Sequence, residues 1–186
     1  FPSHWPFSFM EKNIENFFVK KADLITVVSD PLKEKLAARF GDKVITVENG
    51  FDTEEFEKIG KTRFFPDDGR VRLVYTGMLY KGKRDPLPLF KALGLLKSRG
   101  RPVDEKIEII FYGPNSSFLQ DMIHEYAMEQ VVKTPGFVDR ATSLQAQRNA
   151  DLLIFLDWQD PEVQGIITGK LFEYMYAGKP IVCICG

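Results

Sequence analysis

Cysteine and histidine are both scarce in this chain, with two of each among 186 residues. A metal site built from them needs more such residues close together, so we expect no bound metal. The two cysteines, Cys183 and Cys185, stand in one apolar run, and nearby positions on a single strand have poor geometry for a disulfide. We therefore expect reduced, buried thiols in a cytoplasmic protein.

The chain also lacks an excess of charge of either sign, and it has no long apolar run. The 25 Lys and Arg nearly balance the 26 Asp and Glu, for a net charge of −1. No overall field therefore attracts a polyanion, and we expect no nucleic-acid partner. No apolar run approaches the roughly 20 residues of a membrane-spanning helix. The aromatic segment 1–9 is not a basic amphipathic helix, so we expect at most peripheral membrane association.

From residue 71 onward, short apolar runs alternate with stretches of helical periodicity. Strands are predicted at 71–75, 107–111, 152–156 and 181–185, with a short one at 131–134. Helix faces are predicted from Leu89, Phe90, Leu93 and Leu96, from Leu119, Met122, Ile123 and Tyr126, from the segment 144–149, and from Leu171, Phe172, Met175 and Tyr176. This pattern predicts an α/β fold, a Rossmann-like parallel sheet with helices on both faces.

The first 70 residues have a different organisation. A helix is predicted over 10–18, a buried strand over 24–28 and a second strand over 44–47. Asp30 is expected to cap a further helix that ends at Gly41. The charged stretch 52–70 is predicted to be a linker that can contain one short helix. The chain begins at Phe1 and stops directly after an apolar run, so we expect a fragment, truncated at both ends.

Loops that follow the strands are where a parallel sheet binds ligands. The segment 165–180 is a small-residue loop that opens a helix, a suitable anion site, with Gly169 allowing close approach. The loop 75–86 contains Gly77 and three cations, which suits a diphosphate. Gly113 and Val138 follow the next strands. A plain helix and a solvated basic loop explain the first two segments about equally well.

Five features in this order resemble the GT-B glycosyltransferases, closest to the family-four, group-one enzymes. They are 22–29 with 47–52, 75–84, 136–138, 149–151 and 168–181. The last is similar to the helix–turn–strand signature of the C-terminal domain. The segment 75–84 is similar to that domain's first strand and phosphate loop. The resemblance covers most of residues 12–186.

The resemblance implies the C-terminal, donor-binding half of a GT-B fold. Residues 1–52 would be the end of the N-terminal domain and the crossover, 53–70 a linker, and 71–186 the donor domain. It implies a retaining hexosyltransferase that moves a sugar from UDP or GDP to a glycan or lipid-linked acceptor, in cell-envelope polysaccharide biosynthesis. It also implies a cytoplasmic location, at the inner face of the membrane, and no metal or other cofactor. The fragment alone is expected to be inactive, because the acceptor binds to the other domain.

The resemblance also assigns site residues. Glu173 would hold the ribose hydroxyls, and Arg84 with Lys83 would contact the diphosphate. Backbone groups at Thr168 and Gly169 would add to that contact, and the loop at Val138 would contact the base. Lys170, Gly77 and Gly113 complete the expected donor site. Catalytic residues cannot be named, because the family draws them from the N-terminal domain.

Two positions depart from the family pattern. Gly165 stands where many relatives carry a second glutamate that contacts the sugar, so Asp160, Glu162 and Gln164 are the candidate sugar contacts. Met78 stands where relatives often have arginine, so Arg84 would neutralise more of the phosphate charge by itself. Two alternatives therefore stay open. One is a GT-B nucleotide-sugar epimerase, and the other is a decayed, non-enzymatic Rossmann-like nucleotide-binding or interaction module.

Overall fold

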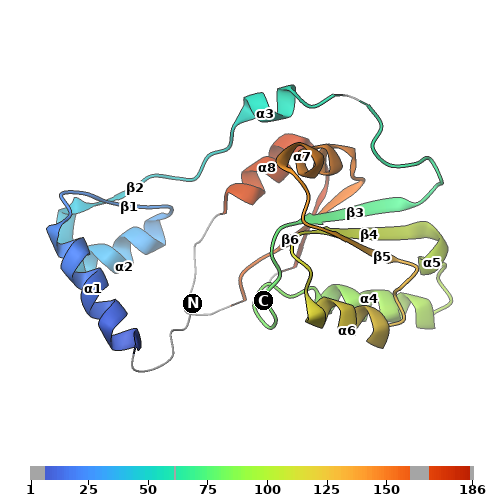
Figure 1. Ribbon diagram of the computed structural model, residues 1–186, viewed down its shortest axis with the longest axis horizontal. Helices are drawn as coiled ribbons and strands as arrows, with labels where there is room; N and C mark the ends of the chain where they lie inside the picture. Colours follow the sequence, from blue (N-terminus) through green and yellow to red (C-terminus); the bar gives the residue numbers. More distant parts are fainter. Residues whose placement is uncertain (1–6, 61, 160–167, 185–186) are drawn as a thin grey trace. The chain divides into compact units, whose positions relative to one another are not determined.

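The computed structural model describes residues 7–60, 62–159 and 168–184. The chain divides into two compact units, which are Phe1–Asn49 with Gln164–Thr168, and Gly50–Val163 with Gly169–Gly186. Each unit is described by itself (Figure 1). In the part of the chain that the structure describes, no helix is long and apolar enough to cross a bilayer.

The first unit pairs two short parallel strands with two helices. Its elements are α1 (Phe7–Lys21), β1 (Ile25–Val27), α2 (Asp30–Phe40), a 3-10 turn (Gly41–Lys43) and β2 (Val44–Thr46). The ammonium of Lys43 donates to the carbonyls of Val19, Lys20 and Ala22 at 2.9–3.0 Å. These carbonyls lie at the end of α1, where no intrahelical partner is available. Lys43 therefore caps α1 from the neighbouring segment.

Two sequence predictions in this unit are wrong in detail. Ser29, not Asp30, is the N-cap of α2, and the Asp30 carboxylate accepts instead from the hydroxyl of Thr46 at 2.6 Å. The predicted buried strand 24–28 shrinks to β1, in which only Val27 is buried. Leu24 lies outside the strand and is exposed.

The second unit is built on a five-stranded parallel sheet in the order β5-β4-β3-β6-β7. The strands are β3 (Val71–Thr76), β4 (Ile107–Tyr112), β5 (Val132–Gly136), β6 (Leu152–Leu156) and β7 (Ile181–Ile184). The chain runs outward from β3 to β5 and then returns to the other side of β3. The strand order therefore reverses beside β3, and ligands of open α/β sheets bind at such a point.

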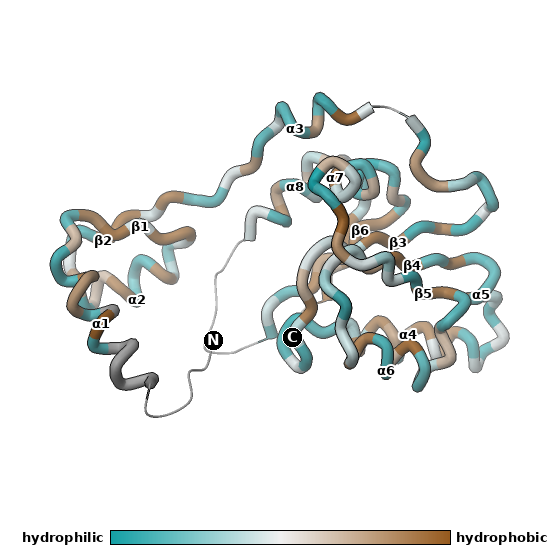
Figure 2. The backbone as a smooth tube through the Cα atoms, viewed as in Figure 1, coloured by the Kyte–Doolittle hydropathy of each residue, from teal (hydrophilic) through white to brown (hydrophobic). Residues whose placement is uncertain are grey.

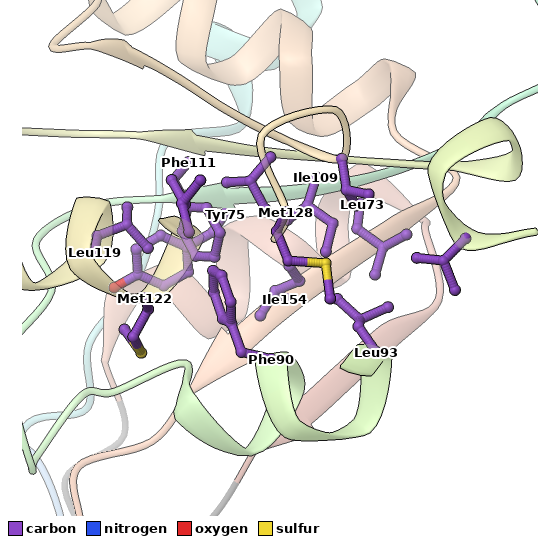
Figure 3. Packing of buried hydrophobic residues seen from close by; sticks show 14 of the residues in the cluster. Leu73, Tyr75, Phe90, Leu93, Ile109, Phe111, Leu119, Met122, Met128 and Ile154 are labelled. Carbon is purple, nitrogen blue, oxygen red and sulfur yellow. The ribbon is translucent and has the colours of Figure 1, made fainter. Parts of the chain in front are cut away.

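Helices cover both faces of this sheet, which confirms the predicted Rossmann-like architecture. α4 (Leu87–Ser98), α5 (Val103–Lys106) and α6 (Ser117–Glu125) lie on one face, and α7 (Arg140–Asn149) and α8 (Gly169–Ala177) on the other (Figure 1). The first face buries Tyr75, Ile109 and Phe111 of the sheet against Phe90 and other helical side chains (Figure 3). Brown, apolar stretches follow the central strands in Figure 2. The short α5 was not predicted.

The amino end of β3 is fixed by a buried arginine. The Arg72 guanidinium binds both oxygens of Asp68, at 2.5 and 2.7 Å, and an oxygen of Glu108 on β4 at 2.8 Å. The Arg72 side chain is only 3% exposed, so both carboxylates are needed to compensate its desolvation. Asp151 also accepts from the backbone N–H of Arg72 at 2.7 Å, which ties β6 to the same point.

Three predictions about buried side chains need correction. Met175 and Tyr176 were expected on the buried face of α8, yet both are exposed, and Tyr174 is the fully buried residue. Leu96, expected on the buried face of α4, is also exposed. Cys183 was expected to be buried, but on the edge strand β7 it is exposed. Cys185 lies outside the described residues.

Tyr174 joins α8 to the carboxyl end of β3. Its hydroxyl accepts from the backbone N–H of Thr76 at 3.0 Å and lies 3.2 Å from the Thr76 hydroxyl. Gln147 of α7 donates to that threonine hydroxyl as well, at 3.2 Å. Burial raises the pKa of Tyr174 to about 12, so the phenol stays neutral at working pH. This contact fixes α8 against the strand end.

Tyr174→Phe is expected to lower the free energy of unfolding by about 1–3 kcal/mol, because it leaves the buried Thr76 N–H without its acceptor. Urea denaturation of the two proteins measures the difference. Tyr176→Phe is the matched control, since its ring contacts Phe51 and Phe56 but the residue is 43% exposed. Equal losses in both variants would contradict a structural role for the Tyr174 hydroxyl.

Candidate functional site

Glycines let the carboxyl ends of three adjacent strands approach closely. The Gly77 N–H donates to the Tyr112 carbonyl at 2.7 Å, and the Gly113 N–H donates to the Gly136 carbonyl at 3.0 Å. Gly77 and Gly113 have φ values of 133° and 157°. A Cβ on Gly113 would collide with the carbonyl oxygen of Gly77. Two neighbouring turns therefore pack with backbone directly against backbone.

A pocket of about 470 Å³ opens beside these glycines. Its walls come from the ends of β3 and β4, the loop after β5, the first residues of α7 and the first turns of α8, all within the second unit. They are lined by Thr76, Gly77, Met78, Tyr112, Gly113, Pro114, Phe137, Val138, Arg140, Ser143, Lys170 and Glu173. The pocket thus lies at the edge of the sheet where the fold predicts a ligand site.

Lys170 brings a largely buried ammonium to this pocket. Its Nζ atom lies 4.3 Å from the centroid of the Tyr75 ring, and a side chain on Gly77 would collide with it. Burial, helped by the nearby charge of Arg84, lowers the pKa of Lys170 to about 7. Lys170 makes no hydrogen bond or ion pair with any residue that the structure describes. A bound anion would therefore favour the protonated form of Lys170, an amine that is only partly protonated near neutral pH in the empty pocket.

The basic loop after β3 is held in a fixed shape. Tyr80 and Arg84 form an isolated antiparallel bridge, and the buried carboxylate of Asp85 accepts from the N–H groups of Gly82 and Leu87 at 2.8 and 2.9 Å. Asp85 thus both closes the turn and begins α4. No local pattern in the sequence indicated this role for Asp85.

Lys83 and Arg84 lie against an aromatic ring rather than on the pocket wall. The Lys83 ammonium is 5.5 Å and the Arg84 guanidinium 5.6 Å from the centroid of Trp158, within range of cation–π attraction. Gln159 donates its N–H to the Lys83 carbonyl at 2.9 Å, which links this loop to the segment after β6. The Arg84 Nε atom is buried and finds no hydrogen-bond partner among the described residues.

Glu173 lines the pocket from α8 and is paired with Arg140. The Arg140 Nη2 atom donates to Glu173 at 2.7 Å and to Glu55 of α3 (Thr53–Glu57) at 2.8 Å, while its Nε atom donates to Glu55 at 3.0 Å. These bonds, the one to Glu173 first, raise the pKa of Arg140. The Glu173 side chain is 16% exposed, so the carboxylate is partly shielded from solvent.

The structure brings some of the predicted site residues together and not others. Gly77, Gly113, Val138, Lys170 and Glu173 line one pocket. Lys83 and Arg84 lie beside Trp158, although the charge of Arg84 reaches Lys170. Gly169 begins α8, and Thr168 groups with the first unit. Asp160, Glu162 and Gln164 lie outside the described residues, as does Gly165.

Sequence reasoning missed Arg140 as a pocket residue. The loop 136–139 was expected to form a wall for a base, and Arg140 follows it directly. Its position at the start of α7 was the available signal, because a side chain there points back toward the loop at the strand end. Its pairing with Glu173, 33 residues away, had no signal in the sequence.

No group of three or more His, Cys, Asp or Glu side chains is placed to hold a metal ion within the described ranges. The absence of a metal or cofactor requirement remains a prediction.

Part of the chain matches one known protein family, and the chain resembles several solved structures. A family described as Glycosyltransferase Family 4 matches residues 1–55, which is 55 of the 186 residues. No curated protein matches the chain. The solved structures that resemble it include Anabaena HepE (Alr3699) in complex with UDP-glucose. That match has 18% identity and a TM-score of 0.65, and covers 98% of this chain and 50% of HepE.

Two further structures extend the likeness. A variant of S. aureus TarM, solved with fondaparinux, alpha-GlcNAc-glycerol and UDP, is 15% identical with a TM-score of 0.61, covering 91% of this chain and 32% of TarM. WaaG, a glycosyltransferase involved in lipopolysaccharide biosynthesis, is 12% identical with a TM-score of 0.61, covering 85% and 43%. The chain shares the fold of GT-B glycosyltransferases. It spans between about a third and a half of the length of these three proteins.

Proposed function

We propose that this chain is the donor-binding half of a retaining glycosyltransferase and binds a nucleoside-diphosphate sugar in the pocket beside Gly77. Glu173 holds the ribose hydroxyls, and Lys170 and Arg84 neutralise the diphosphate, with Lys83 behind them. Val138 contacts the base. Residues 1–52 belong to the end of the N-terminal domain and the crossover, 53–70 to the linker, and 71–186 to the donor domain.

One observation carries this proposal. Two basic side chains, Lys170 and Arg84, form no ion pair with a carboxylate of the described residues, and they stand close enough for the Arg84 charge to depress the pKa of Lys170, while Glu173 acts on that pKa in the opposite direction. Two basic groups close together in a partly buried site favour a doubly charged anion over a neutral ligand. HepE and TarM, which share the fold, were solved with UDP-glucose and UDP respectively, which supports a nucleotide as that anion.

The match of residues 1–55 to Glycosyltransferase Family 4 supports a transfer of sugar, and the details of that transfer are part of the same proposal. A hexose passes from UDP or GDP to a glycan or lipid-linked acceptor held by another domain, in the cytoplasm at the inner face of the membrane. Asp160, Glu162 and Gln164 are the candidate contacts to the sugar. Neither metal nor other cofactor takes part. The chain alone binds donor without transferring sugar.

Titration calorimetry with UDP and GDP tests the binding site. One diphosphate is expected to bind in the micromolar to millimolar range, about −8 to −4 kcal/mol. Glu173→Gln and Arg84→Ala are each expected to weaken it by roughly tenfold or more, the loss of one charge-assisted hydrogen bond or ion pair. The preferred diphosphate identifies the base.

Glu125→Gln and Arg101→Ala are the matched controls, since both residues are exposed and lie outside the pocket. Both controls are expected to bind as the unaltered chain does. A folded chain that binds neither diphosphate would contradict the proposal and favour a decayed module.

A further inference from the structure

Arg140 lies between carboxylates from two other helices. Its guanidinium donates to Glu55 of α3 through two nitrogens and to Oε1 of Glu173 through one. Of the two carboxylates, Glu173 is the less exposed and lies in the pocket wall. The arginine therefore connects the pocket to a helix that takes no part in lining it.

The position of Arg140 is set by the elements around it. Asp139 caps α7 by accepting from the Thr142 N–H at 2.7 Å, which fixes the first turn of the helix. α3 is fixed to α7 in turn, because its buried Phe56 packs against Leu144, and Arg148 donates to the Phe56 carbonyl at 2.9 Å. Glu55 is thereby presented to Arg140 from a helix that is itself held in place.

This arrangement orders Glu173 before any ligand arrives. A glutamate has three side-chain torsions, and fixing them costs free energy that a ligand must otherwise supply. The bond from Arg140 uses Oε1 of Glu173, and Oε2 accepts no hydrogen bond from the described residues. One carboxylate oxygen is thus held by protein while the other remains available to a hydroxyl donor in the pocket.

We propose that Arg140 is a positioning residue that orients Glu173 toward the ribose hydroxyls of the bound nucleotide, and that Glu55 orients Arg140. The inference rests on the proposed function. It makes α3 part of the mechanism by which the pocket selects ribose, although α3 does not touch the nucleotide.

The test compares the affinities of UDP and 2′-deoxy-UDP, or of GDP and its 2′-deoxy form where GDP binds tighter. The unaltered chain is expected to prefer the ribonucleotide by about tenfold, the value of one good hydrogen bond. Arg140→Ala is expected to bring this preference to within about twofold of unity. Arg140→Lys is expected to restore part of it, because lysine keeps the charge but lacks the planar guanidinium that donates to two carboxylates at once. Glu55→Gln is expected to give an intermediate ratio.

Other outcomes overturn the inference. A structural role for Arg140 would lower stability while leaving the ratio unchanged, and a direct contact with phosphate would weaken both nucleotides equally. In a Glu173→Gln background, Arg140→Ala is expected to leave the ratio as it is, and a further fall would contradict action through Glu173. Failure of the unaltered chain to bind either nucleotide overturns the proposed function itself, a different result from binding with an unchanged ratio.

Discussion

Gly113→Ala is expected to lower the free energy of unfolding by about 3 kcal/mol or more, the sum of a strained backbone angle and an overpacked contact. The new Cβ would collide with the Gly77 carbonyl oxygen, an atom of the backbone that cannot rotate away. Moving either turn would break the bond from Gly77 to Tyr112 or the bond from Gly113 to Gly136. Urea unfolding followed by circular dichroism measures the loss, and nucleotide affinity should fall with it.

Gly82→Ala separates the two contributions. Gly82 also has a positive φ, 70°, but a Cβ there meets nothing within 4 Å. It should cost only the backbone term, about 1–2 kcal/mol. If the two variants lose the same stability, the close approach of the two strand ends is not what requires glycine at position 113.

The second large effect is on pH dependence. Lys170 has a pKa of about 7 in the empty pocket because burial disfavours its charge. A bound diphosphate raises that pKa, so binding takes up a proton between the two values. Affinity is therefore full below about pH 7, falls by up to about tenfold per pH unit above it, and levels off beyond the pKa of the complex. Titrations between about pH 6.5 and 9 avoid protonation of the terminal phosphate, whose pKa is near 6.

Lys170→Arg is the control for this prediction, because arginine stays charged throughout the range. Its affinity should change little with pH, and calorimetry in two buffers of different ionisation enthalpy should show proton uptake only with lysine. The stability of the empty protein changes in the opposite direction. Since the unfolded chain binds more protons at Lys170 between pH 7 and its ordinary pKa near 10.5, this residue makes the fold more stable as pH rises through that range. A flat affinity profile in the unaltered chain would contradict the assignment of Lys170.

The sheet was predictable because local patterns encode it. The run Leu152–Leu156 is apolar on both faces, which indicates a strand covered on both sides, and β6 has these bounds. Apolar periodicity failed at α8, where the residue that is buried is Tyr174. A tyrosine can be buried when its hydroxyl finds a partner, and that partner, Thr76, is 98 residues away.

The site was predictable only in part, for a related reason. Gly77, Lys170 and Glu173, which line the pocket, were predicted because each follows a strand or lies near the start of a helix, which is a local property. The bonds from Arg140 to Glu55 and Glu173 span 85 and 33 residues and depend on how α3, α7 and α8 pack. Pairings of this kind follow from tertiary structure, and hydrophobic periodicity does not encode them.

The ion network around Arg72 gives the two ends of β3 different responses to ionic strength. Dissolved ions screen charges that are exposed to solvent. At 0.1 M salt, the interaction between exposed charges more than about 10 Å apart is largely screened. Arg72 itself is buried and Glu108 is largely so, and added salt therefore has little effect on this pair, although the Asp68 carboxylate is 41% exposed. At the opposite end, Lys170 and Arg140 line an open pocket, where dissolved anions compete with any bound phosphate. Buffer salts can therefore weaken ligand binding without loosening the fold beneath it.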